Sequence, residues 1–165
     1  MAWPVRFPAL RLAVLLNELL TSERVRVPLR AESKQDLLRE LVGLLHESGA
    51  VADAQGVLAS VLQREEVLST GVGSGVAIPH GKSGSVPELV MAAGVTRGPV
   101  DFDSLDGEPV RLVFLLVGPE TAAGQHVKAL SRISRLMRRD GFRERLLEAR
   151  SAEDFMALLT EAEAL

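Results

Sequence analysis

The spacing of apolar residues predicts two helices in the first half of the chain. After Ser33, leucines recur three and four residues apart, which favours a helix that Ser33 caps and Gly49 ends. Asp53 is expected to cap the next helix, which carries Arg64 near its end. The apolar positions of this second helix should face inward: Val57, Leu58, Val61 and Leu62.

Short apolar runs between the polar stretches predict strands. Val110–Val117 is apolar at almost every position, which is typical of a central strand that is buried on both faces. Leu89–Thr96 is expected to form a second buried strand. Val25–Leu29 predicts a shorter strand, in which Pro28 marks an edge or an end. Residues 10–20 predict a helix at the start of the chain.

The last part of the chain predicts three more helices, over about residues 122–138, over about residues 141–149, and after a cap at Ser151. Asp154 is placed to complete a rough capping box with Ser151. Strands that alternate with helices predict an α/β fold in a single domain, with a mixed β-sheet sandwiched between helices in three layers, α/β/α. We expect this domain to span residues 21–165, and residues 1–20 to form an N-terminal arm or helix.

Composition removes several classes of function. The 165 residues are 47% hydrophobic and 25% charged, as in ordinary globular proteins, and a net charge of −3 gives no reason to expect nucleic acid as a partner. The chain has no cysteine, which excludes disulfides and thiolate chemistry. The apolar stretch over residues 7–20 is interrupted by Arg11, Asn17 and Glu18 and is too short to span a bilayer. We therefore expect a cytoplasmic protein with no direct membrane insertion.

The stretch from Arg64 to Ser83 carries the main candidate chemistry. Three glycines at alternate positions and a short apolar run lead to Pro79, His80 and Gly81. Glycine allows other groups to approach the backbone closely, and a proline favours an extended conformation in the residue before it. His80 should therefore lie at the mouth of an extended segment, where another molecule can reach its imidazole. An ordinary loop histidine is the simpler alternative.

His126 and Arg64 are the other candidate site residues. At 100° per residue, His126 falls on the apolar face of its predicted helix, in the first turn, so it should point towards the sheet. A helix N-terminus beyond a strand favours an anion, and Arg64 can hold phosphoryl oxygens with two parallel hydrogen bonds. The alternatives are a histidine at the edge of the core and a surface cation at a helix end, and the sequence leaves both open.

Motifs for nucleotides and metals are incomplete. Gly81-Lys82-Ser83 is similar to the end of a phosphate-binding loop, but Val76 stands where that motif requires a glycine. The same valine breaks the glycine pattern of a dinucleotide-binding turn. The three histidines lack the spacing of metal ligands: His46, His80 and His126. We expect neither a cofactor nor a metal.

Two motifs together match a known family. From Arg64 to His80 the chain reads R-E-x-x-x-S-T-G-x-G-x-G-V-A-I-P-H, followed by G-K-S, and residues 125–130 read Q-H-V-K-A-L. From about Thr21 to Ala162 the sequence resembles the enzyme IIA components of the phosphoenolpyruvate-dependent sugar phosphotransferase system. The resemblance is to their type 2 branch, which contains fructose, mannitol and nitrogen-regulatory members. The fold of that family, a mixed sheet between helices, agrees with the pattern of strands and helices.

The resemblance implies a phosphotransferase in which one histidine is phosphorylated and then passes the group on. His80 matches the phosphorylated histidine of the family. His126 matches the second histidine, which supports the phosphoryl group, and Arg64 matches the arginine close by. Residues 21–165 would accordingly form an enzyme IIA type 2 domain.

Two roles are consistent with that resemblance. In the first, His80 accepts the phosphoryl group from the histidine phosphocarrier protein HPr and passes it to an enzyme IIB partner for uptake of a fructose- or mannitol-like sugar. In the second, the phosphorylation state of His80 controls binding to regulatory proteins. Ser74 stands where many sugar-transport members have an acidic residue, which favours regulation, whereas Gly81-Lys82-Ser83 is typical of fructose-like members. We find no IIB or membrane IIC segment and expect a stand-alone IIA.

Overall fold

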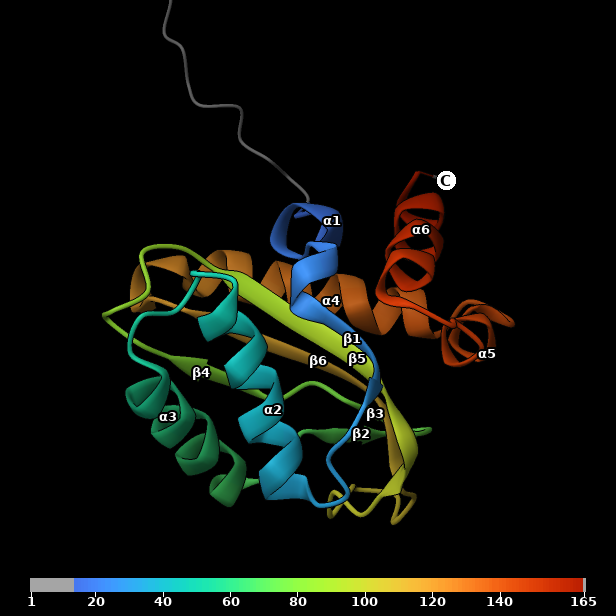
Figure 1. The fold of residues 1–165 in the computed structure, drawn as a ribbon, viewed down its shortest axis with the longest axis horizontal. Coiled ribbons are helices and arrows are strands. Elements are labelled where there is room, and N and C mark those ends of the chain that lie inside the picture. Colours follow the sequence, from blue (N-terminus) through green and yellow to red (C-terminus); the bar gives the residue numbers. More distant parts are fainter. Residues whose placement is uncertain (1–13, 165) are drawn as a thin grey trace, which may run out of the picture.

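The computed structural model describes residues 14–164 and places a mixed sheet between two layers of helices (Figure 1). Helices α2 and α3 cover one face, and α1, α4, α5 and α6 cover the other (Figure 1). The predicted three-layer α/β/α arrangement in one domain is therefore confirmed. The helices are α1 (Leu16–Leu19), α2 (Lys34–Glu47), α3 (Ala54–Val67), α4 (Ala123–Met137), α5 (Phe142–Leu147) and α6 (Ala152–Glu163), with short 3₁₀ helices η1 (Ser22–Arg24) and η2 (Glu120–Ala122).

The sheet is built around its longest apolar run. The strands are β1 (Val25–Leu29), β2 (Gly71–Gly73), β3 (Val76–Ala77), β4 (His80–Lys82), β5 (Val90–Val100) and β6 (Val110–Gly118). Their order is β1-β5-β6-β3-β2, and β4 also pairs with β6. Strand β5 runs antiparallel to β6, whereas β3 and β4 run parallel to it. β6 is thus the central strand, as predicted, and β1, which contains Pro28, lies at the edge.

Strand β6 is apolar throughout because it contributes to two separate cores. Successive side chains of a strand point to opposite faces. One set packs under α4, α5 and α6: Leu112, Phe114 and Leu116. The other set packs under α2 and α3: Val113, Leu115 and Val117. Each of these six side chains is fully buried, so neither face of the strand can accept a polar residue without cost.

The predicted helix caps are confirmed. The side chain of Ser33 accepts a hydrogen bond from the backbone N–H of Asp36, and Asp53 accepts one from Gly56. Ser151 caps α6 in the same way. The capping box at Ser151 is wrong in detail, because the carboxylate of Asp154 accepts from the backbone N–H of Arg150, at 3.3 Å, rather than from that of Ser151.

Two expectations from apolar spacing need correction. The helix predicted over residues 10–20 covers only Leu16–Leu19 within the described residues, and residues 10–13 lie outside them. Leu58 and Leu62 of α3 are only partly buried, because they lie at the border of the face that packs on the sheet. Among residues 14–164, no helix is both long enough and apolar enough to cross a membrane.

Candidate functional site

His80 begins β4, which α3 holds against the end of β6. In the parallel pairing of these strands, His80 lies opposite Leu116. The hydroxyl of Ser60 donates to the carbonyl oxygen of Lys82 at 2.8 Å and accepts from its N–H at 3.1 Å. A Cβ atom at Gly81 would lie 2.8 Å from the side chain of Val61, so glycine is required for this close packing. Helix α3 therefore fixes the backbone that carries His80.

The imidazole of His80 is held in one tautomer. Its Nδ1 lies 3.1 Å from the carbonyl oxygen of Ile78, and since a carbonyl only accepts hydrogen bonds, Nδ1 carries the proton. In the neutral ring, Nε2 then keeps an unprotonated lone pair. Burial lowers the pKa of His80; the positive charges of Arg64 and Lys82 act in the same direction, against the hydrogen bond to Ile78 and the charge of Glu65. The ring is thus neutral at about pH 7.

His126 lies beside His80 because of the strand order. Helix α4 follows β6, and parallel strands end at the same edge of a sheet, so the start of α4 lies next to β4. The two imidazole rings meet edge to face, with centroids 4.9 Å apart and planes at 70°. His126 is 9% exposed and faces inward, as its helical spacing predicts. The structure therefore brings the two candidate histidines together.

Nε2 of His126 is an unusual atom. It is buried and has no hydrogen-bond partner among residues 14–164, whereas most buried polar atoms are paired. The pKa of His126 is lowered to about 4, mainly by burial and also by the charges of His80 and Lys82. His126 is thus neutral at about pH 7, and its ring can offer one N–H donor to a neighbouring group.

Arg64 lies in the last turn of α3, close enough for its charge to lower the pKa of His80. One of its terminal nitrogens, Nη1, donates to the carbonyl oxygen of Leu68 at 3.0 Å. This bond holds the guanidinium at the end of the helix. Because the planar guanidinium has several further N–H donors, a phosphoryl group can still be bound by them.

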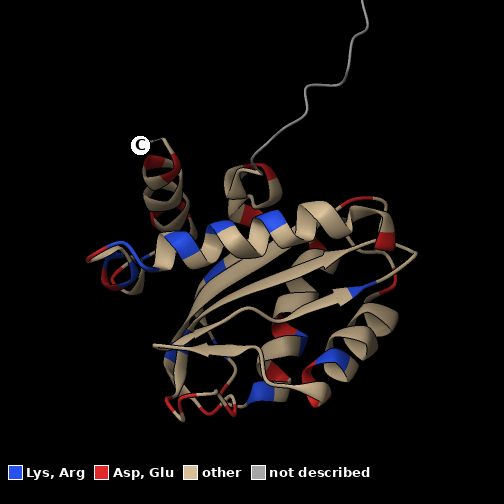
Figure 2. Ribbon diagram, turned by 180° about the vertical axis from the view of Figure 1, so that it is seen from behind, with Lys and Arg blue, Asp and Glu red and all other residues tan. Residues whose placement is uncertain are grey.

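Sequence reasoning missed Lys82 as a site residue. Its positive charge lowers the pKa of both His80 and His126. The signal was present, because residues two apart on a strand point to the same face. Helix α4 also carries three basic residues and no acidic one, visible as blue bands in Figure 2: Lys128, Arg132 and Arg135. Arg132 of this helix is ion-paired with Glu163 at 2.7 Å, and the cations that act on the two neutral histidines are Arg64 and Lys82. Their positive charge favours an anion at this point.

Sequence reasoning also missed Glu65, which is buried beside Arg64. Its carboxylate accepts hydrogen bonds from Thr70 and forms an ion pair with Lys34, with 3.0 Å between Nζ and Oε1. No pattern in the sequence connects Lys34 with Glu65, since the two residues lie on different helices.

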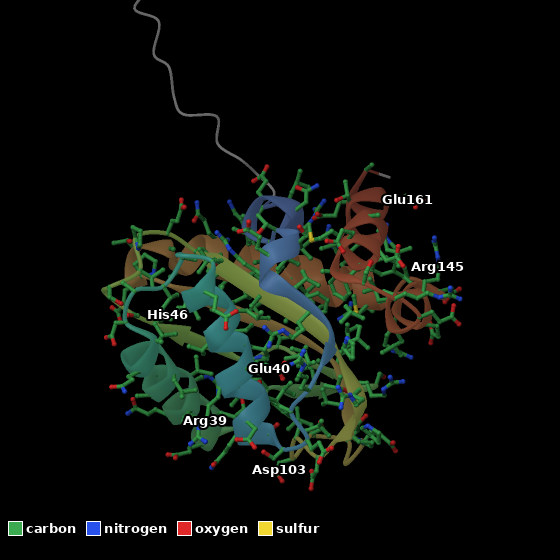
Figure 3. All side chains as sticks on the ribbon, in the orientation of Figure 1. Arg39, Glu40, His46, Asp103, Arg145 and Glu161 are labelled. Atoms are coloured by element: carbon green, nitrogen blue, oxygen red, sulfur yellow. The ribbon has the colours of Figure 1, made fainter. Side chains whose placement is uncertain are left out.

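His46 is placed apart from this site. It lies in the last turn of α2 (Figure 3), and its Nδ1 is 2.9 Å from the carbonyl oxygen of Val51. Within residues 14–164, no group of three or more histidine, cysteine, aspartate or glutamate side chains is arranged to hold a metal ion.

Curated relatives of known name match most of the chain. It is 37% identical over 146 residues to the "PTS system fructose-specific EIIABC component" of Bacillus subtilis. The match covers 88% of this chain and 23% of that protein. The chain thus spans less than a quarter of that relative. It is 38% identical over 144 residues to a "Nitrogen regulatory protein" of Bradyrhizobium diazoefficiens, which covers 87% of this chain and 94% of that protein.

Solved structures and a family model agree with these relatives. The nitrogen regulatory protein IIA-Ntr of Neisseria meningitidis is 37% identical, with a TM-score of 0.79 over 87% of this chain and 97% of that one. The mannitol enzyme IIA of Escherichia coli, solved in complex with phosphorylated enzyme IIB, shares the fold at 20% identity and a TM-score of 0.74, over 86% of this chain and 97% of that one. The model of "Phosphoenolpyruvate-dependent sugar phosphotransferase system, EIIA 2" matches residues 18–162. The chain therefore belongs to the type 2 enzyme IIA family of the phosphoenolpyruvate-dependent sugar phosphotransferase system.

Proposed function

We propose that this protein carries a phosphoryl group on Nε2 of His80, accepts it from an HPr-like phosphocarrier protein and passes it to a second protein. The main support is the hydrogen bond between Nδ1 of His80 and the carbonyl oxygen of Ile78. This bond leaves Nε2 as the free nucleophile, next to a second neutral histidine.

The proposed transfer exchanges one N–P bond for another and leaves the proton of each imidazole in place. The lone pair on Nε2 of His80 attacks the phosphorus of the donor's phosphohistidine. A new N–P bond forms while the donor's N–P bond breaks, and the electron pair of the broken bond returns to the donor nitrogen. Each ring keeps the proton on its other nitrogen. The carbonyl of Ile78 then stabilises the phosphorylated, positively charged ring by accepting its Nδ1–H.

The residues around His80 are suited to hold the three outer oxygens of the phosphoryl group. When the proton of the neutral ring is on Nε2, His126 supplies an N–H donor there, and no described residue accepts a hydrogen bond from this atom. Arg64 supplies the free donors of its guanidinium, and Lys82 adds a second positive charge. Phosphoryl transfer depends mainly on such positioning and charge stabilisation.

For the acceptor we propose an enzyme IIB partner in uptake of a fructose-like sugar. The fructose-specific relative and the fold shared with an enzyme IIA that was solved with its IIB support this acceptor. Regulation of partner proteins is the second candidate, and the nitrogen regulatory relative, at 38% identity over 144 residues, favours it. The two roles share the chemistry at His80 and differ in the fate of the phosphoryl group.

Phosphorylation can be tested with phosphoenolpyruvate, enzyme I and HPr, followed by intact mass. One acid-labile, base-stable phosphoryl group is expected, and ¹⁵N NMR should assign it to Nε2 of His80. His80→Ala should remove it; equal labelling of that variant would contradict the proposal. Adding an enzyme IIB then separates the roles. Loss of the label to IIB supports transport, whereas a label that stays in place and alters binding to a regulatory protein supports regulation.

A further inference from the structure

We infer that Glu65 is a positioning residue for His80, acting through a chain of hydrogen bonds that runs from its carboxylate through Thr70 and Ile78 to the imidazole. This inference rests on the proposed function, because it concerns the same reacting ring. It assigns a role in phosphoryl transfer to a side chain that does not itself touch the phosphoryl group.

The series of hydrogen bonds begins at the carboxylate of Glu65, which its neighbours hold in a fixed position. The side chain of Glu65 is 4% exposed. It accepts hydrogen bonds from the backbone N–H of Thr70 at 2.8 Å and from the Thr70 hydroxyl at 2.6 Å. Lys34 supplies the opposite charge at 3.0 Å. A buried carboxylate is tolerated only when it is paired and hydrogen-bonded in this way, so Glu65 fixes the position of Thr70.

Two backbone hydrogen bonds continue from Thr70 to His80. The carbonyl oxygen of Thr70 accepts from the N–H of Ile78 at 2.9 Å, which closes the base of the β2–β3 hairpin. The carbonyl oxygen of Ile78 accepts from Nδ1 of His80 at 3.1 Å. Each bond positions a residue, Thr70 or Ile78, whose other backbone group makes the next bond. The position of the carboxylate is therefore transmitted to the tautomer and orientation of the imidazole.

Lys34, the ion-pair partner of Glu65, is itself held by residues outside the site. Nζ of Lys34 lies 4.8 Å from the centre of the Phe102 ring and 3.5 Å from the carboxylate of Asp103. Phe102 is fully buried, and Asp103 lies near the start of α2 (Figure 3). Because Lys34 is held by several partners, the ion pair fixes Glu65 rather than following its movements.

Charge gives Glu65 a second effect on the ring. Three charged groups act on His80: Arg64 and Glu65 of α3 and Lys82 of β4. The neutral ring of His126 of α4 lies against the imidazole of His80. Among these, only Glu65 raises the pKa of His80, in opposition to the dominant effect of burial. Removing its charge should therefore move the titration of His80 to lower pH.

The test compares Glu65→Gln with Glu66→Gln. Glu66 is the adjacent residue, is exposed, and loses the same charge, but it has no place in the chain of hydrogen bonds. In the unphosphorylated protein, ¹⁵N NMR reports the tautomer of His80 and its titration midpoint. Glu65→Gln should give a mixed tautomer and a lower midpoint, and should slow phosphorylation by HPr about tenfold. Glu66→Gln should match the wild type in all three.

A second pair of variants covers the case in which Glu65→Gln does not fold. Thr70→Val removes the hydroxyl but keeps the shape and the backbone N–H, and should also give a mixed tautomer of His80. Thr70→Ser keeps the hydroxyl and should keep the single tautomer of His80. A folded Glu65→Gln protein, or failing that Thr70→Val, with wild-type tautomer and rate would overturn the inference. If wild-type His80 is not phosphorylated, the proposed function fails, and the tautomer and titration still decide whether Glu65 positions the ring.

Discussion

The imidazoles of His80 and His126 meet edge to face, with 4.9 Å between ring centroids, although they come from a strand and a helix that lie far apart in the sequence. Two protonated rings at this distance would repel each other, which contributes to the low pKa of His126. Both rings are neutral at about pH 7, so one can act as a nucleophile and the other as a hydrogen-bond donor.

The first prediction concerns stability at acid pH. Burial lowers the pKa of His126 from 6.5 to about 4, so the unfolded chain binds a proton in this interval that the native state does not. The stability from His126 is therefore complete above about pH 6.5 and is lost as the pH falls towards 4. Up to about 2 kcal/mol should be lost between about pH 7.5 and pH 5, measured by urea denaturation. The His126→Gln variant should lose less of its free energy of unfolding over this interval. A pH dependence of stability equal to that of the wild type would contradict this role of His126.

The second prediction concerns the role of His126 in transfer. His126→Ala should fold and still be phosphorylated on His80, but it should pass the group on more slowly, because a donor to the phosphoryl oxygens is lost. Single-turnover transfer to an acceptor measures this step. Ser131→Ala, at an exposed position of the same helix, is the control. Onward transfer at the wild-type rate would leave His126 as a packing residue only.

The third prediction separates charge from geometry at Arg64. Lysine keeps the charge and can still donate to the carbonyl of Leu68, so Arg64→Lys should leave the melting temperature almost unchanged. It lacks the planar fork, however, and should slow phosphotransfer through His80 about tenfold or more. Arg39→Lys, on the exposed side of α2 (Figure 3), provides the matched control. Normal transfer by Arg64→Lys would remove Arg64 from the site.

The fourth prediction tests the packing that holds His80. A Cβ atom at Gly81 would lie 2.8 Å from Val61 and 3.1 Å from the hydroxyl of Ser60, so Gly81→Ala should push α3 away from β4. We expect a loss of about 1–3 kcal/mol in the free energy of unfolding, together with slower phosphorylation. Gly84→Ala has no atom within 4 Å of the added methyl group and should change neither. Equal stability of the two variants would show that β4 can relax.

The long elements could be predicted from the sequence because their patterns are local. Strand β6 is apolar on both faces, and α2 carries leucines at helical spacing, so each identifies itself without its neighbours. Strands β2, β3 and β4 have two or three residues each, too few to show any period. They exist because they pair with one another or with β6, and that pairing is a property of the folded chain.

The same distinction applies to the site. The inward direction of His126 follows from helical periodicity, and the setting of His80 follows from the residues next to it. The influence of Lys82 and Glu65 depends on how α3, β4 and α4 pack together, and the partner of Glu65 lies on α2. Spacing within one element cannot reveal such contacts.

The hydrogen bond that occupies Nδ1 of His80 also restricts the order of events. With one nitrogen engaged by Ile78, a single nitrogen faces other molecules, so donor and acceptor must use the same approach and exclude each other. Under the proposed function, exchange should follow double-displacement kinetics, and an excess of unphosphorylated donor should compete with the acceptor. The phosphorylated fraction then reports the balance between supply and demand of phosphoryl groups rather than either flux alone.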